Sequence, residues 1–128
     1  MYIQFISNIK QGENDNKIDF TALVNISSYE GLVAYEFKDP STDVLNRIEV
    51  SEEAINIFIA QNTINIKLNK MCNVNYDTPQ GMIVFQSFGK KFEIKKDNIK
   101  FEYNLEQNGN TLGEYFIELK ILEKIGNK

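Results

Sequence analysis

Five aromatic residues are the strongest candidates for a chemical role, because their spacing places them on one side of a β-sheet. In segments 92–95 and 99–105, apolar and polar residues alternate strictly, which is typical of a strand with one buried face. The aromatic residues expected on the inward side are Phe92, Phe101, Tyr103 and Tyr115, and Tyr76 is expected to join them. Such rings either fill a core or line a cavity, where tyrosine hydroxyls can orient a polar group of a bound molecule.

A second candidate is a set of lysines interleaved with phenylalanines between residues 85 and 100. Basic residues beside aromatic rings can bind single-stranded nucleic acid by stacking. The alternation, however, sends Lys91, Lys95 and Lys100 to one face and the rings mainly to the other, whereas stacking needs both on the same face. The net charge of -4 also disfavours a polyanion. We therefore expect no nucleic-acid partner.

Catalysis and metal binding receive little support from the residue types. The sequence contains no histidine, which is the usual general base near neutral pH and the commonest metal ligand. Glu52 and Glu53 lie in an expected turn, and the carboxylates of the last strands lie on outward positions, where they usually aid solubility. The oxygen-rich run 13–16 lacks the ligand spacing of a calcium loop. We expect no enzymatic activity, no cofactor and no metal site.

The length and composition are those of one globular domain. The chain has 128 residues, 42% of them hydrophobic, and contains only 7 glycines and 2 prolines. Residues 1–8 lack the basic region and long apolar run of a signal peptide, and no stretch approaches the roughly 20 apolar residues of a membrane helix. We expect a cytoplasmic protein with a single domain over residues 1–122 and a tail over residues 123–128 that frays.

The elements that position the aromatic residues are about ten short strands. Period-two alternation also occurs at 18–22, 55–57 and 64–68, and again between 115 and 121. Short strands separated by turns of a few residues indicate a sandwich or a closed barrel. The sequence therefore predicts an all-β, antiparallel fold.

Segment 51–59 fits either a helix or a strand, and the register of its neighbours favours the strand. A four-residue turn at 51–54 sets Val50 opposite Ile55, and a two-residue turn at 61–62 then sets Ile59 opposite Ile64. Both turns keep apolar residues on one face, as a buried sheet requires. We predict a strand with these pairs.

The last hairpin is also predicted from its register. A two-residue turn at Asn108 and Gly109 would place Tyr115 on the wrong face if the strands were regular. A three-residue loop over 107–109, with Gly109 left-handed and followed by a bulge, pairs Phe101 with Tyr115 instead. We predict the three-residue loop.

A turn near the middle of the chain carries a resemblance to a known family. In the run Tyr76-Asp77-Thr78-Pro79-Gln80-Gly81, Pro79 supplies the fixed φ of a first central turn position and Gly81 closes the turn. Together with the ending at 101–109, this run resembles the YwiB-like family of uncharacterised bacterial proteins, whose fold is similar to that of the calycins. The resemblance implies a lipocalin-like barrel of about eight to ten strands and a bacterial cytoplasm, but no activity.

Two functions remain open from the sequence. The first is a non-enzymatic binding module that takes a small apolar or amphipathic molecule into the barrel. The second is a protein-interaction or structural domain with a filled barrel. Phe116 and Leu122 favour the second, because they are apolar residues on the otherwise charged side of the last strand, where they can form a dimer contact. The chain is expected to be a monomer or a homodimer, with no membrane partner.

Overall fold

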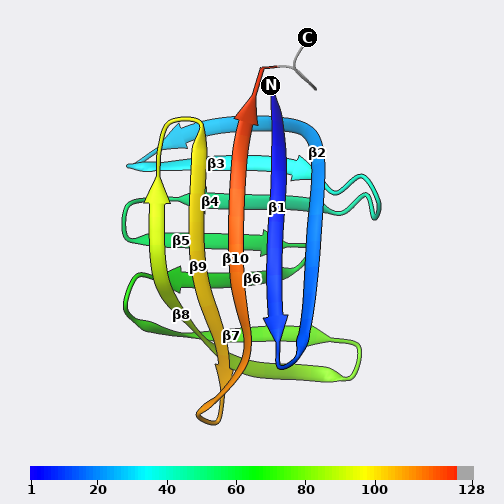
Figure 1. The fold of residues 1–128 in the computed structure, drawn as a ribbon, viewed down its shortest axis with the longest axis vertical. Helices are drawn as coiled ribbons and strands as arrows, with labels where there is room; N and C mark the ends of the chain where they lie inside the picture. The colour runs from blue at the N-terminus through cyan, green and yellow to red at the C-terminus, as the bar shows by residue number, and fades with distance from the viewer. Residues whose placement is uncertain (124–128) are drawn as a thin grey trace.

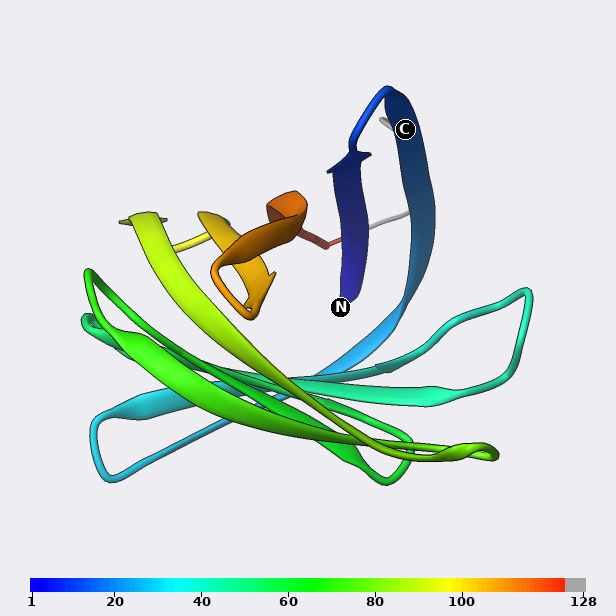
Figure 2. The same cartoon turned by 90° about the horizontal axis from the view of Figure 1, so that it is seen from below.

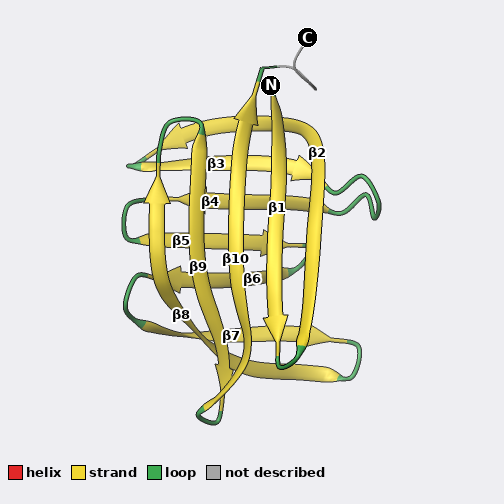
Figure 3. Ribbon diagram, viewed as in Figure 1, coloured by secondary structure: helices red, strands yellow, loops and turns green. Residues whose placement is uncertain are grey.

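The computed structural model describes residues 1–123, and this part of the chain folds into strands without a helix. Figure 3 shows these strands joined mostly by short turns. The ten strands are β1 (Tyr2–Gln11), β2 (Asn14–Tyr29), β3 (Leu32–Lys38), β4 (Leu45–Val50), β5 (Ala54–Ile59), β6 (Asn62–Lys67), β7 (Met71–Thr78), β8 (Gly81–Ile94), β9 (Asn98–Gln107) and β10 (Asn110–Leu122). Residues 124–128, which belong to the tail expected to fray, lie outside the described part.

The strands form two layers that cross one another. In Figure 1, β8, β9, β10, β1 and β2 run vertically in front, and β3 to β7 run across behind them. Figure 2 shows the gap between the layers from below, with the rear layer curved around it. All ten strands belong to one antiparallel sheet in the order β6-β5-β4-β3-β2-β1-β10-β9-β8-β7. The all-β antiparallel prediction is therefore confirmed, as a nearly closed barrel of ten strands.

Two long strands turn the corner between the layers. β2 pairs with β1 through residues 14–23 and with β3 through residues 24–29, so that one strand serves both layers. β8 pairs with β7 through residues 81–88 and with β9 up to Ile94, with an irregularity between Gly89 and Lys91. Strands that change layer by a bend or bulge are the usual corners of orthogonally packed sheets.

The barrel is closed along the β6–β7 side by a few contacts instead of a regular ladder. Leu68 forms a parallel bridge with Gly89, and the Asn69 amide donates to the Gly89 carbonyl at 2.8 Å. Farther along, the Asn62 side chain accepts from the Asp77 amide at 2.9 Å and donates to the Asp77 carbonyl at 3.3 Å. A side chain therefore replaces the missing backbone pairing.

Inward side chains from both layers form one core. The predicted alternation is present, because Ile99, Phe101, Tyr103 and Leu105 are all buried while their neighbours on β9 are more exposed. The buried side chains of the rear layer are mainly isoleucine and valine, which suit a pleated surface. This core leaves part of the barrel beside residues 18–20 of β2 incompletely filled.

The register predictions for segment 51–67 are confirmed in part. The segment contains a strand, and Val50 pairs with Ile55 as predicted. The pairing of Ile59 with Ile64 is wrong, because Ile59 pairs with Asn62 and Ile57 pairs with Ile64. The turn falls at residues 60–61, where Ala60 adopts a positive φ of 53°. The pairing of β5 with β6 is thus shifted by two residues from the predicted register. A shift of two leaves the isoleucines on the predicted face.

The prediction for the last hairpin is wrong in turn length and right in which face is buried. Asn110 pairs with Gln107, so the turn has two residues, Asn108 and Gly109, with φ values of 53° and 80°. A bulge between Thr111 and Gly113 then restores the inward direction of the following residues. As a result Tyr115 pairs with Tyr103, and Phe101 pairs with Ile117 instead of Tyr115.

Candidate ligand-binding cavity

A cavity of about 360 Å³ lies between the two layers. Its walls come from β1, β2, β9 and β10 on one side and from β3, β4 and β5 on the other. Most of the lining is apolar, and the side chains that dominate it are Phe5, Phe20, Phe37, Ile48, Ile57 and Ile117. A volume of a few hundred cubic ångströms with mainly apolar walls is typical of a small-molecule site.

Three phenylalanines from separate strands meet at the wall of this cavity. The ring centroids of Phe5 and Phe20 are 5.3 Å apart, those of Phe5 and Phe37 are 5.6 Å apart, and those of Phe20 and Phe37 are 6.0 Å apart. Sequence reasoning missed this cluster as a lining. The available signal was the alternation in segments 3–9 and 18–22, which places Phe5 and Phe20 inward.

Two of the five aromatic residues singled out in the sequence line the cavity, namely Tyr103 and Tyr115. Their rings are stacked, with centroids 4.7 Å apart and planes within 5° of parallel, because the β9–β10 register sets them directly opposite one another. Burial raises the pKa of the Tyr103 hydroxyl, and the nearby Tyr115 and Tyr76 raise it further. Burial also raises the pKa of the Tyr115 hydroxyl, so the hydroxyls of Tyr103 and Tyr115 are both neutral at neutral pH.

The other three residues pack beside the cavity and do not line it. Phe92 and Phe101 meet edge to face with ring centroids 6.4 Å apart, and Phe101 is 1% exposed. Tyr76 packs against Phe85 with ring centroids 6.4 Å apart. Of the three, Phe101 contacts the tyrosine pair directly, because its ring stacks on Tyr103 with centroids 6.1 Å apart.

The cavity opens beside the part of β2 that does not pair with the rear layer. Residues 14–23 of β2 pair with β1 and the pairing of β2 with β3 starts only at Val24, so the barrel has an open corner there. Ile18 lines the cavity at this corner and is 42% exposed. Across the opening lies the loop over residues 39–44, which Figure 2 shows curling up from the rear layer toward β2.

The polar groups of the cavity are few and lie at identifiable places. Ser7 is buried in the wall, Thr42 belongs to the 39–44 loop, and Asn46 lies just after this loop on β4. Asp39 supplies a carboxylate, whose Oδ1 accepts hydrogen bonds from the Ser41 hydroxyl at 2.7 Å and the Ser41 amide at 2.8 Å. These two hydrogen bonds lower the pKa of Asp39. The carboxylate is therefore ionised at neutral pH.

The turn residues singled out in the sequence lie at hairpin ends away from the cavity. Thr78 pairs with Gly81 across a two-residue turn formed by Pro79 and Gln80. The Thr78 hydroxyl donates to the Gly81 carbonyl at 2.7 Å and accepts from the Gln80 amide at 3.2 Å. Gly109 is the second residue of the last turn, with a φ of 80°.

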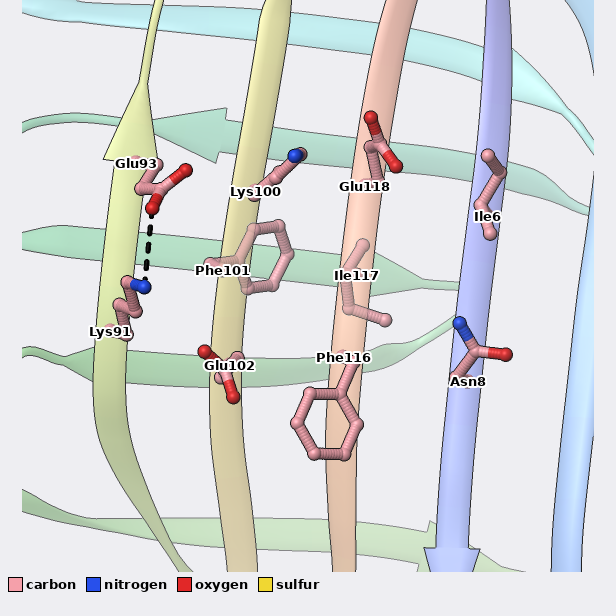
Figure 4. Close-up of a pocket in the computed structure, with 10 residues that line it drawn as sticks. All are labelled: Ile6, Asn8, Lys91, Glu93, Lys100, Phe101, Glu102, Phe116, Ile117 and Glu118. Carbon is pink, nitrogen blue, oxygen red and sulfur yellow. Dashed lines mark ion pairs between the residues drawn. The ribbon is translucent and has the colours of Figure 1, made fainter.

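The outer face of the front layer carries a shallow groove of about 330 Å³. Figure 4 shows its floor, where Phe116 and Ile6 lie among charged side chains of the neighbouring strands. Lys91 forms an ion pair with Glu93 at 3.2 Å, and Lys10 lies 5.9 Å from the centre of the Phe116 ring. Lys91 and Lys100 both line this groove, so these two lysines lie on the outer face, away from the stacked inner rings.

A carboxylate network covers the outer face of the rear layer, and sequence reasoning did not single it out. Glu49 is only 9% exposed, yet it accepts hydrogen bonds from Tyr29 at 2.9 Å, Arg47 at 3.1 Å and Asn56 at 3.2 Å. Arg47 also contacts Glu36 at 3.3 Å. Burial acts to raise the pKa of Glu49, but the three hydrogen bonds and the Arg47 charge outweigh it and lower that pKa.

The fold and the cavity together define a class: a nearly closed, antiparallel barrel of ten strands with an internal apolar cavity. Within that class the chain belongs to the family described as Domain of unknown function (DUF1934), whose model matches residues 3–119. An uncharacterized protein of Mycoplasmopsis pulmonis (strain UAB CTIP) is 34% identical over 126 residues, which cover 96% of this chain and 100% of that protein.

A solved structure shows the same fold. The crystal structure of the YwiB protein from Bacillus subtilis superposes with a TM-score of 0.70, at 12% sequence identity, over 94% of this chain and 90% of that one. The resemblance to the YwiB-like family is thereby confirmed. Among residues 1–123, no helix is long and apolar enough to cross a membrane.

Proposed function

We propose that this protein is a non-enzymatic binding module that takes a small, partly apolar molecule into the cavity between its two layers. The observation that carries the proposal is the cavity itself, which holds about 360 Å³ and opens beside Ile18. A barrel whose interior side chains fill all the space offers no room for a ligand. Here the walls of Phe5, Phe20 and Phe37 leave room and present flat apolar surfaces to it.

The chemistry of the lining supports binding over catalysis. General acid–base work needs titratable groups whose environments separate their pKa values around neutrality. The described side chains of the cavity include one carboxylate, Asp39, whose pKa is lowered, and two tyrosines whose pKa values are raised. All three are shifted away from neutrality. Their roles are therefore to orient a ligand, and the apolar walls supply its binding energy.

The direct test is native mass spectrometry of freshly purified protein, followed by titration of the delipidated protein with Nile red. We expect a co-purifying small molecule, or an increase in dye fluorescence that saturates at one equivalent. A protein that carries nothing and leaves the dye unchanged would overturn the proposal.

A pair of matched variants locates the binding. Ser7→Phe adds a ring inside the cavity, and Asn8→Phe adds the same ring one residue along β1, on the outer face shown in Figure 4. We expect Ser7→Phe to weaken dye binding at least tenfold, because the ring occupies the ligand volume, and Asn8→Phe to leave it unchanged. The melting temperature of each variant checks that it folds, and Ile9→Trp repeats the test from another wall position. Equal effects of both phenylalanines would place the dye elsewhere.

The second candidate is a protein-interaction role through the outer groove. The observation that favours it is the partly exposed Phe116 among charged side chains, since an apolar centre with a polar rim is the common anatomy of an interface. Sedimentation velocity over a range of concentrations tests self-association. A concentration-dependent dimer that Phe116→Ser abolishes would favour this role, and a monomer at every concentration would argue against a homodimer.

A further inference from the structure

The cavity lining is asymmetric in charge. Among the described side chains that line it, Asp39 is the charged one, and neither lysine nor arginine is present. A carboxylate or phosphate head group entering this cavity would therefore meet a like charge and find no cation. A ligand with a positive head group would meet an opposite charge beside an apolar wall.

The position of Asp39 suits it to contact a head group. It lies in the 39–44 loop at the mouth, while Phe5, Phe20 and Phe37 form the wall farther in. Both hydrogen bonds from Ser41 engage Oδ1, so they hold the carboxylate in one orientation and keep it ionised. A fixed carboxylate costs less conformational entropy on binding than a freely rotating one.

The neighbouring charges leave the mouth negative. Lys38 precedes Asp39 directly in the chain, but its ammonium group lies 3.9 Å from the carboxylate of Asp43. Both of those side chains are largely exposed and form a pair of their own on the outside of the loop. The Lys38–Asp43 pair is neutral as a unit, so the charge of Asp39 is not cancelled.

We infer that the ligand has an apolar body and a cationic head group of the alkylamine type, with the body between the two layers and the head against Asp39. This inference rests on the proposed binding function and specifies its ligand class. A hydrogen bond between an ammonium group and a carboxylate is about twice as strong as one between neutral groups. The same carboxylate discriminates against fatty acids, whose head group it repels.

Three probes with the same alkyl chain and different head groups test the inference. We would titrate the delipidated protein with octylamine, octanol and octanoate by isothermal calorimetry at about pH 7, where the amine is protonated. We expect octylamine to bind about tenfold more tightly than octanol, and octanoate to bind most weakly. Octanoate binding as tightly as octylamine, or no difference between amine and alcohol, would overturn the charge inference while leaving the binding function intact. Binding of none of the three would overturn both.

Two isosteric variants identify the group responsible. Asp39→Asn removes the charge and keeps an oxygen that can accept from Ser41, whereas Asp19→Asn removes an exposed carboxylate of β2 that does not line the cavity and keeps an oxygen that can accept from Gln4. We expect octylamine to lose its advantage over octanol in Asp39→Asn and to retain it in Asp19→Asn. Retention of the advantage in Asp39→Asn would show that Asp39 does not contact the head group.

Discussion

Gly89 lies where β8 passes closest to the chain between β6 and β7. A Cβ atom at this position would lie 2.5 Å from the Lys67 carbonyl oxygen and 2.9 Å from the Lys67 carbonyl carbon, which are both backbone atoms. Such a separation is well inside van der Waals contact, and the backbone cannot rotate away as a side chain can. Glycine is therefore required here by close approach, and the bridge to Leu68 depends on it.

We predict that Gly89→Ala destabilises the fold by about 2 kcal/mol or more, because the added methyl group must push β8 away from the barrel seam. Urea unfolding measures the change. Gly31→Ala is the matched control, since Gly31 has a φ of 83° but nothing within 4 Å of its added Cβ, and it should lose about 1 kcal/mol from backbone strain. A smaller loss at Gly89 than at Gly31 would contradict the close-approach argument.

Glu49 shows how a buried carboxylate is kept ionised. Tyr29, Arg47 and Asn56 come from three different strands of the rear layer, and their hydrogen bonds converge on its two oxygens. A carboxylate with several donors stabilises the folded state in its ionised form. The network links β2, β4 and β5 on the side of the layer opposite the core.

We predict that Glu49→Gln destabilises the protein at about pH 7 by roughly 1–3 kcal/mol, the usual cost of losing hydrogen bonds to a buried charge. The folded-state pKa is lower than the ordinary value of 4.5, so the ionised form contributes stability above pH 4.5 and loses it as the pH falls through the lowered value. Urea unfolding of both proteins at about pH 7 and about pH 3 should therefore show a difference that shrinks in acid. A difference that is the same at both pH values would contradict this account.

The last hairpin illustrates how an element satisfies two conflicting requirements. The Asn108-Gly109 pair favours a two-residue turn, while the apolar residues of β10 require a shift of one residue to face inward. The bulge between Thr111 and Gly113 supplies that shift, and Leu112, which is left without a partner, is 38% exposed. The turn keeps its favoured length because the strand absorbs the mismatch.

We predict that deletion of Leu112 is tolerated, because the residues on either side of the bulge then join a regular ladder and Tyr115 still faces inward. Deletion of Glu118 is the control, since it removes one residue from regular pairing and sends one end of β10 to the wrong face. Circular dichroism and urea unfolding should show a cooperative fold for the first variant and its loss for the second. Cooperative folding of both would argue against the bulge as the register device.

The burial side of each strand could be predicted from the sequence, but the turns could not all be located. Alternation fixes which residues face inward, and it held for Ile57, Ile64 and Tyr115 even where their partners were wrong. Ala60 takes a positive φ at the β5–β6 turn, a backbone conformation that glycine and asparagine favour and alanine does not. Turns at 60–61 and at 61–62 both keep the isoleucines on one face, so the alternation could not decide between them, and the predicted turn lies one residue too late in the chain.

At the scale of the whole molecule, the barrel follows a simple path with one interruption. Each strand pairs with the strands before and after it in the chain, except that β6 and β7 do not form a ladder. The pairing of β1 with β10 makes the sheet continuous on the other side of the barrel. A barrel was predictable from short alternating strands. The position of the seam was not, because it depends on contacts such as those of Gly89 with Leu68 and Asn69, which carry no local signal.

The aromatic lining of a cavity could be predicted from the sequence, but the position of the cavity in the barrel could not. Inward aromatic residues suggested a lining, but Phe92, Phe101 and Tyr76 pack into the wall behind it. The cavity lies instead beside residues 18–20 of β2, in the part of this strand that pairs with β1 and not with β3. The point at which β2 changes partner, between Leu23 and Val24, leaves no mark in the alternation. The one carboxylate of the cavity comes from the 39–44 loop, which the sequence indicated only as a polar connection.

The pairing of β1 with β10 has a consequence for the folding of this protein during translation. β1 is synthesised before β10, so one edge of β1 stays open beside the β1–β2 pair until β10 emerges and pairs with it from Tyr2–Leu122 to Lys10–Glu114. The rear layer and the β1–β2 hairpin can pair during translation, whereas the front layer becomes continuous only after residue 122 has left the exit tunnel. The edge of β1 that pairs with β10 therefore stays unpaired until β10 is available, and an unpaired strand edge in a partly folded chain favours aggregation.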